Sequence, residues 1–182
     1  MASDSPDLQV YSVSFQALDR ALDEALTPAL KERFRELGVD FDFPLKKSYP
    51  LAVWAQALSM AAEVLHPQLP DPERHLALGK RILDTFGETI VGSVLLAAAR
   101  VLGTRRMLDR AAHNMRQANN FTEVLFEDPA PRHVVLRFNR VSSPEFYRGL
   151  LLRGLELTRA TNPTVSYERL DGEKVAYTVR WD

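Results

Sequence analysis

The chain contains no cysteine among its 182 residues. This absence excludes disulfides, thiolate catalysis, zinc–cysteine sites and iron–sulfur clusters, and it fits a reducing compartment, so we expect a cytoplasmic protein. Long hydrophobic runs are also missing. The most apolar stretch, residues 90–103, is interrupted by Arg100 and is too short to span a bilayer. The polar, acidic N-terminus does not resemble a signal peptide, so neither secretion nor a membrane span is predicted.

Sequence motifs of common enzymes are absent as well. The chain has no G-x-S-x-G, no G-x-x-x-x-G-K-[ST] and no H-E-x-x-H, and its 8 glycines form no dinucleotide-binding fingerprint. We therefore predict no catalytic residue and no metal site, and we favour a non-enzymatic protein.

The net charge is only −1, but the two signs are unevenly distributed. Residues 1–73 carry 6 Lys and Arg against 12 Asp and Glu, whereas residues 74–182 carry 17 against 12. Such an asymmetry indicates either an anionic partner or an attraction between the two halves of the chain. Because the basic residues are not interleaved with aromatic ones, we expect a small molecule or a protein as partner, and not a nucleic acid.

The overall composition is that of an ordinary globular protein. The first two-thirds of the chain shows helical periodicity. Thr27, Asp71 and Thr104 are expected to cap the helices that follow them. Residues 88–103, which are apolar on nearly all sides, are predicted to form the central buried helix. The expected helices cover residues 15–26, 28–38, 51–66, 72–87, 88–103 and 105–117.

After Asn119 the hydrophobic period changes from about 3.6 to 2, as a change from helix to strand requires. The alternation predicts strands at residues 121–127 and 133–139. A helix at residues 144–158 follows, and then a hairpin at residues 164–181 with a glycine-containing turn.

These patterns predict an α+β fold in a single domain, residues 1–182. Residues 1–8 are expected to be a frayed tail, and residues 9–118 a helical assembly. Residues 119–182 are predicted to form a small, mostly antiparallel four-stranded sheet with one crossing helix, in the order strand–strand–helix–strand–strand.

One polar stretch, "GTRRMLDRAAHNMRQANNFTE" at residues 103–123, suggests a ligand site. On a helix, Asp109 lies one turn before His113 and can orient its imidazole, while Arg106 and Arg110 line a neighbouring strip. The alternative interpretation is a solvated histidine on an exposed charged face. If the protein were an enzyme, Asp109 and His113 would be its acid–base pair.

The pair Asn119 and Asn120 stands where this helix ends. Asparagine often bonds to local backbone in turns, which is one reason for the pair. The other is a pocket between this helix end, Arg137 and the helix at residues 144–158. The candidate ligand-binding residues are therefore Arg106, Arg110, His113, Asn119, Asn120 and Arg137.

Five segments, in this order and spacing, resemble a myxobacterial paralogous family of about this length whose members have no assigned activity. These segments are "YPLAVWAQAL" (49–58), "LGTRRMLDR" (102–110), "NNFTEV" (119–124), "EFYRGLLLRGLELT" (145–158) and "VAYTVRW" (175–181). The resemblance covers nearly the whole chain. It implies a set of related but diverged, regulatory proteins.

A second likeness is to the heme-nitric oxide/oxygen binding domain and to the vinyl-reductase-type small-molecule-binding domain, in both of which helices precede a sheet. The heme domain carries a proximal histidine before its sheet and a Tyr-x-Ser-x-Arg motif on a strand. Here His113 falls about one turn from the ligand position, and the strand reads "LRFNR" (136–140), with the arginine but without the tyrosine and serine. The likeness implies a related fold and a small ligand, while no cofactor is predicted and heme is not expected.

The sequence thus favours a sensory or regulatory module that binds a small ligand or a protein partner without heme. The alternatives are a protein-interaction or scaffolding domain and, further off, the Asp109–His113 enzyme.

Overall fold

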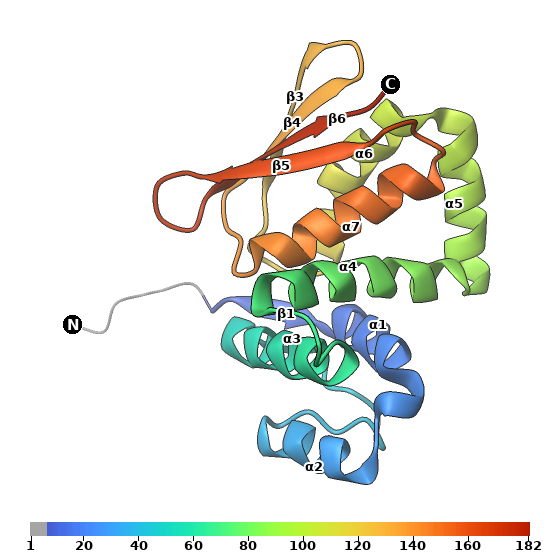
Figure 1. Ribbon diagram of the computed structural model, residues 1–182. Helices are drawn as coiled ribbons and strands as arrows, with labels where there is room; N and C mark the ends of the chain where they lie inside the picture. Colours follow the sequence, from blue (N-terminus) through green and yellow to red (C-terminus); the bar gives the residue numbers. More distant parts are fainter. Residues whose placement is uncertain (1–6) are drawn as a thin grey trace.

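The computed structural model describes residues 7–182, apart from the side chains of Val91 and Leu95. Helices and strands follow the predicted order (Figure 1). The helices are α1 Ser12–Leu22, α2 Pro28–Glu36, α3 Leu51–Leu65, α4 Asp71–Gly87, α5 Ile90–Leu102, α6 Thr104–His113 and α7 Pro144–Leu157, with short 3₁₀ turns η1 Asp23–Ala25 and η2 Asn114–Gln117. The strands are β1 Gln9–Tyr11, β2 Ser48–Pro50, β3 Val124–Ala130, β4 His133–Phe138, β5 Thr164–Arg169 and β6 Val175–Arg180.

Helices α4 and α7 cross at the centre of the molecule, between the N-terminal helices on one side and the sheet on the other (Figure 1). Two glycines make this crossing close. A Cβ atom on Gly79 would lie 2.2 Å from the carbonyl oxygen of Phe146, and one on Gly149 would lie 2.1 Å from that of Leu76. The two backbones therefore touch without intervening side chains, and the helical part is joined to the sheet part through this contact.

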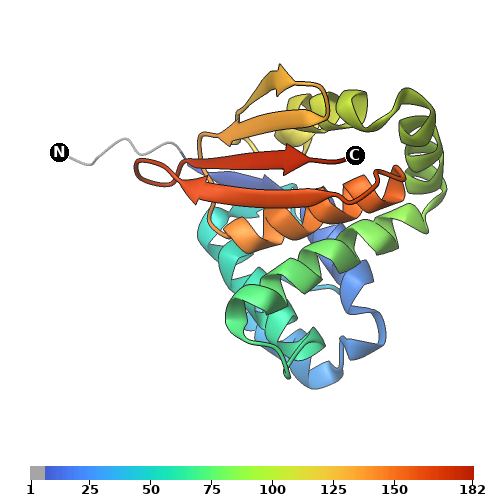
Figure 2. The ribbon, with the colours of Figure 1, turned by 45° about the horizontal axis from the view of Figure 1, so that its top comes forward.

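The C-terminal part forms the predicted four-stranded sheet. The predicted α+β fold of the chain is therefore confirmed. The strand order is β3-β4-β6-β5, and all three pairings are antiparallel. Val134, Leu136 and Phe138 of β4 are buried, as an alternation of two requires, and α7 covers this face of the sheet (Figure 2). The opposite face carries the intervening residues, among them Arg137.

Two short strands at the N-terminal end do not follow from the sequence patterns. Strands β1 and β2 pair antiparallel, with Val10 opposite Tyr49, and β1 also bridges to Asn119. At the end of the predicted tail, residues 1–8, the carbonyl oxygen of Leu8 accepts a 2.8 Å hydrogen bond from the N–H of Leu51. Residues 1–6 of that tail lie outside the described residues. Strand β1 thus ties the start of the chain to the junction between the two parts.

Two hydrophobic clusters form the core. The first gathers buried side chains from α1 to α4, with the ring of Phe15 packed between those of Tyr49 and Trp54, and the second joins α6 and α7 to the sheet around Tyr177. Tyr147 of α7 packs against both clusters. The two parts of the chain therefore meet at the side of α7 that carries this tyrosine.

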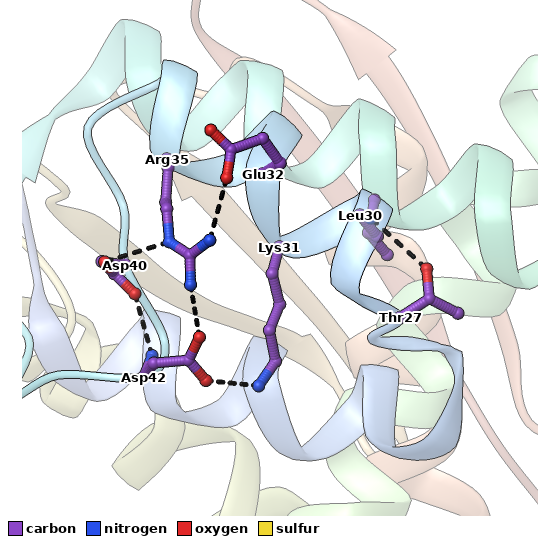
Figure 3. A network of polar contacts seen from close by, with 7 residues as sticks. All are labelled: Thr27, Leu30, Lys31, Glu32, Arg35, Asp40 and Asp42. Atoms are coloured by element: carbon purple, nitrogen blue, oxygen red, sulfur yellow. Dashed lines mark hydrogen bonds and ion pairs between the residues drawn. The ribbon is translucent and has the colours of Figure 1, made fainter.

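An exposed polar network fixes the loop that follows α2 (Figure 3). The guanidinium of Arg35 donates hydrogen bonds to Glu32 at 2.9 Å and to Asp40 at 3.1 Å, and it also contacts Asp42. Asp42 accepts a further bond from Lys31, and this bond is the main reason why the pKa of its carboxyl lies below the usual range. Because the network lies at the far end of the helical part from the sheet, it holds a loop and belongs to no cavity described below.

Helix capping agrees only partly with the sequence. Thr27 caps α2 as predicted, since its hydroxyl oxygen accepts a bond from the N–H of Leu30. The predictions for Asp71 and Thr104 are wrong: each is already the first helical residue, and neither forms a side-chain cap. Both helices start immediately after a residue that cannot cap through a side chain, Pro70 and Gly103.

The prediction that residues 88–103 form the central buried helix is wrong. Helix α5 lies at the periphery, where it links the end of α4 to α6 (Figure 1). Ile90, Val94 and Val101 are exposed to 86%, 63% and 87%. Because this helix is apolar on all sides, its sequence does not show which side is buried or how deeply. The central position is taken by α4 and α7. Among the described residues no single helix is long and apolar enough to cross a membrane, and only the sharply bent α4–α5 pair, taken together, meets the length and composition criteria.

Candidate functional site

An apolar cavity of about 240 Å³ lies where the two parts of the chain meet. Its walls come mainly from α1, α4, α7 and the connecting segment, residues 115–121, which runs from η2 to the sheet; β1, α3 and the segment before α7 complete the lining. The lining side chains are aliphatic or aromatic with few exceptions, and they include Val13 and Ala17 from α1, Ile82, Leu83 and Phe86 from α4, Phe146, Tyr147 and Leu150 from α7, and Met115, Ala118 and Phe121 from the connecting segment.

Asn119 shapes one wall of the cavity through its local hydrogen bonds. Its side chain is buried, and its Oδ1 accepts hydrogen bonds from the N–H groups of Phe121 at 3.1 Å and Thr122 at 2.7 Å. The bonds turn the chain from η2 toward β3 and set Phe121 against the cavity. The predicted turn chemistry of Asn119 is therefore present, and the residue also lines the cavity.

Asn120 holds strand β1 in place. Its Oδ1 accepts a 2.9 Å bond from the N–H of Gln9, and its Nδ2 donates a 2.8 Å bond to the carbonyl oxygen of Asp7. It borders a smaller recess beside the cavity, together with Asn139 and Arg140. The structure thus brings the asparagine pair to the cavity region, with Asn119 inside it and Asn120 next to it.

The remaining predicted site residues lie away from this cavity. Arg106 and Arg110 are exposed on α6, and the side chain of His113 is 74% exposed. The Nδ1 atom of His113 lies 2.8 Å from the carbonyl oxygen of Asp109 and 3.3 Å from its carboxylate. Arg137 faces away from α7 and donates a 2.8 Å bond to Glu127. These residues form no common site with the asparagines.

Arg140, the last residue of the "LRFNR" stretch, is a charged lining residue that was not among the predicted site residues. It lines the cavity together with Ser142, from the segment between β4 and α7, and its guanidinium is paired with the carboxylate of Glu173. This segment is held at both ends: Asn139 exchanges bonds with Glu123 and Phe121, and the N–H of Val141 donates to the carbonyl oxygen of Glu173 at 2.8 Å. Arg140 is therefore presented to the cavity by fixed backbone.

Tyr147 of α7 adds a phenol group to the cavity wall. Burial raises the pKa of its phenol, and the neighbouring Thr122 hydroxyl only partly opposes that effect. The phenol therefore stays protonated at neutral pH and can act as a hydrogen-bond donor to a ligand.

Two further cavities are polar. One of about 330 Å³ lies between the starts of α4 and α7 and is lined by His75, Glu145, Tyr167 and Arg169, among others. The other, of about 600 Å³, is bordered by His66 and Arg81. Across residues 7–182 no group of three or more His, Asp or Glu side chains is arranged to hold a metal ion.

His66 should make the stability of the protein depend on pH. Its buried Nε2 finds no hydrogen-bond partner among the described residues, and burial, with a smaller effect of Arg81, lowers its pKa below 6.5. The folded state therefore favours the neutral imidazole. Its contribution to stability is complete above the unfolded-state pKa and is lost as pH falls through the folded-state pKa.

We therefore expect the free energy of unfolding, measured with urea, to fall more steeply toward acid pH in the wild type than in His66→Gln. The comparison should run from roughly pH 8 to 5, across the histidine range. His113→Gln, which removes an exposed imidazole, is the control and should follow the wild type. Equal slopes for the wild type and His66→Gln would show that His66 does not contribute to the pH dependence of stability.

Comparison with known proteins places the chain in a family. The sequence matches the model described as "Protein of unknown function (DUF2378)" over residues 8–182. The chain belongs to this family. A search of curated proteins found no match to the DUF2378 chain.

Solved structures of H-NOX domains share the fold of this DUF2378 protein. An oxygen-binding H-NOX domain related to soluble guanylate cyclases, in its oxygen complex, superposes with a TM-score of 0.69 at 12% identity, covering 94% of each chain. An H-NOX protein from S. oneidensis in the Fe(II)NO ligation state gives 0.66 at 11% identity, covering 94% of this chain and 99% of that one. The unliganded Fe(II) H-NOX protein from K. algicida gives 0.61 at 13% identity, covering 92% and 95%. The predicted likeness in fold is confirmed.

Proposed function

We propose that this DUF2378 protein is a sensory or regulatory module that binds a small, largely apolar ligand in the cavity of about 240 Å³, without heme. The observation that carries the proposal is the position of the cavity, in contact with both parts of the chain. A ligand there touches α1 and α4 on one side and α7 and the connecting segment on the other. Its binding energy therefore acts on the contact between the two parts.

The size and lining of the cavity suit a molecule of one or two rings. An engineered apolar cavity of roughly 150 Å³ stays dry and binds benzene. The cavity described here is larger, at about 240 Å³, and the polar residues of its lining are Ser14, Asn119, Arg140, Ser142 and Tyr147. Ligand pockets commonly combine such an apolar wall with a few polar groups that fix orientation.

Heme does not fit these residues. The lining contains no histidine, and His113, the imidazole nearest in sequence, is 74% exposed. Tyr147 is a poor substitute ligand for iron, because its raised pKa favours the neutral phenol over the phenolate. A tetrapyrrole is also several times larger than the benzene-sized molecules that cavities of this order hold. These observations support binding without heme, although the H-NOX proteins of the same fold include oxygen and Fe(II)NO complexes.

The enzyme alternative receives little support from the placement of its residues. An acid–base pair needs a substrate held next to it, within hydrogen-bonding distance. The Asp109–His113 pair lies on the open surface of α6, and neither residue lines any of the four cavities found in the described part of the chain.

Indole, a compact bicyclic molecule, tests the proposal directly. We expect it to cause saturable methyl NMR shifts at Ile82, Leu83 and Leu150, which line the cavity, and none at Leu30, which is buried elsewhere in the core. Shifts of equal size at Leu30, or no saturable shift at all, would count against the cavity as a ligand site.

Hemin tests the heme-free part of the proposal. After incubation with hemin and gel filtration, the protein is expected to carry no Soret band in a one-to-one ratio. A stable one-to-one band would overturn binding without heme. The indole experiment would still decide whether the cavity is a ligand site.

A further inference from the structure

We propose that the physiological ligand of the cavity is a small carboxylic acid with an apolar body, whose carboxylate binds Arg140 at the cavity mouth. This inference rests on the proposed function and names the ligand class. The observations are the apolar walls, a single cationic side chain in the lining, and the arrangement of its counter-ion.

Arg140 stands at the boundary between the apolar cavity and solvent. Its side chain is 35% exposed, and it borders both the main cavity and the neighbouring small recess. A carboxylate that meets it there remains partly hydrated, so the large cost of burying an ion is avoided. The apolar body of the same molecule extends inward between α1, α4 and α7.

The guanidinium has capacity for a second anion. One of its terminal nitrogens, Nη1, is engaged by Glu173, and for residues 7–182 the structure records no bond from its other nitrogens. An arginine carries five N–H donors in a planar fork, which suits a carboxylate on a second edge. Glu173 itself lies in the exposed turn between β5 and β6, with 49% of its side chain exposed. It therefore competes with the ligand for the same cation.

This competition gives two variants with opposite effects. Arg140→Gln removes the cation and should weaken binding of the acid, whereas Glu173→Gln removes the competing anion and should strengthen it. Both variants break the same Arg140–Glu173 ion pair. If that pair only stabilised the loop, both would change binding in the same direction.

The probes are 3-phenylpropanoate and its uncharged analogue 3-phenylpropanamide, which have nearly the same size and shape. Isothermal titration calorimetry at neutral pH should show the acid binding the wild type about tenfold more tightly than the amide, as a charged hydrogen bond at a partly exposed site implies. Arg140→Gln should reduce this preference to near unity, and Glu173→Gln should increase it.

Arg137→Gln is the matched control. Arg137 lies three residues earlier, also pairs with a glutamate, and faces away from α7, so the change removes the same charge without touching the cavity. Its preference for the acid should stay within about twofold of the wild type, because distant exposed charges are screened by salt.

The outcomes separate the two proposals. If neither probe binds and indole also fails, the cavity function is wrong and this inference falls with it. If the amide binds as tightly as the acid, or if Arg140→Gln and Arg137→Gln have equal effects, the cavity remains a ligand site and only the carboxylate assignment is overturned.

Discussion

Gly149→Ala should lower the free energy of unfolding by about 3 kcal/mol, the upper part of the range for overpacked cores. The added Cβ would lie 2.1 Å from the carbonyl oxygen of Leu76 and 3.2 Å from the Cα of Gly79. These are backbone atoms of α4, so no rotamer change can relieve the contact and the two central helices must separate. The gain in helix propensity, at most about 1 kcal/mol, does not offset this cost.

Gly154→Ala, five residues further along α7, is the matched control. There the new methyl group would meet only the side-chain ends of Leu83 and Met107, each at 3.6 Å, which is ordinary contact. We expect this variant to match the wild type or exceed it slightly. Thermal unfolding should place Gly149→Ala roughly 6–12 °C below the wild type for a chain of this size. Equal melting temperatures for the two variants would show that the crossing is looser than described.

Val13→Trp should weaken the binding of indole and of 3-phenylpropanoate at least roughly tenfold while leaving the fold intact. Val13 lines the cavity from α1, yet 51% of its surface is exposed, so a larger side chain can enter the cavity from its rim. Displacing the buried part of an apolar ligand costs about 1.5–3 kcal/mol, which corresponds to a loss in affinity of at least roughly tenfold.

Gln16→Trp provides the comparison, because Gln16 is exposed on the same helix and does not line the cavity. Both variants should melt within a few degrees of the wild type, and only Val13→Trp should lose affinity in calorimetry. Unchanged affinity in Val13→Trp would mean that the ligands bind somewhere other than this cavity.

Local patterns in the sequence predicted most of the secondary structure. Thr27 before Pro28 marked the start of α2, and the alternation of Val134, Leu136 and Phe138 marked the buried face of β4. Both signals depend on neighbouring residues alone. Strands β1 and β2 have only three residues each and depend on pairing between distant parts of the chain, so no periodicity could reveal them.

The candidate site was harder to predict, since its walls are ordinary core residues. An apolar side chain such as Phe86 or Leu150 has the same sequence signal whether it meets another side chain or a cavity. Asn119 was found because turn residues are distinctive. Arg137 was chosen as a site residue, whereas Arg140 lines the cavity. Arg140 lies beyond the end of β4 at Phe138, so the alternation of the strand does not tell which way its side chain points.

The exposed apolar side chains of helix α5 determine which substitutions the chain can accept there. Substitutions at Ile90, Val94 and Val101 change little buried surface, because these side chains are already largely in water in the folded chain. Polar residues there would preserve folding and improve solubility, so drift should replace the aliphatic ones unless another requirement retains them. A comparison of DUF2378 sequences at these three positions would therefore separate residues kept for the stability of the monomer from residues kept for what the protein does.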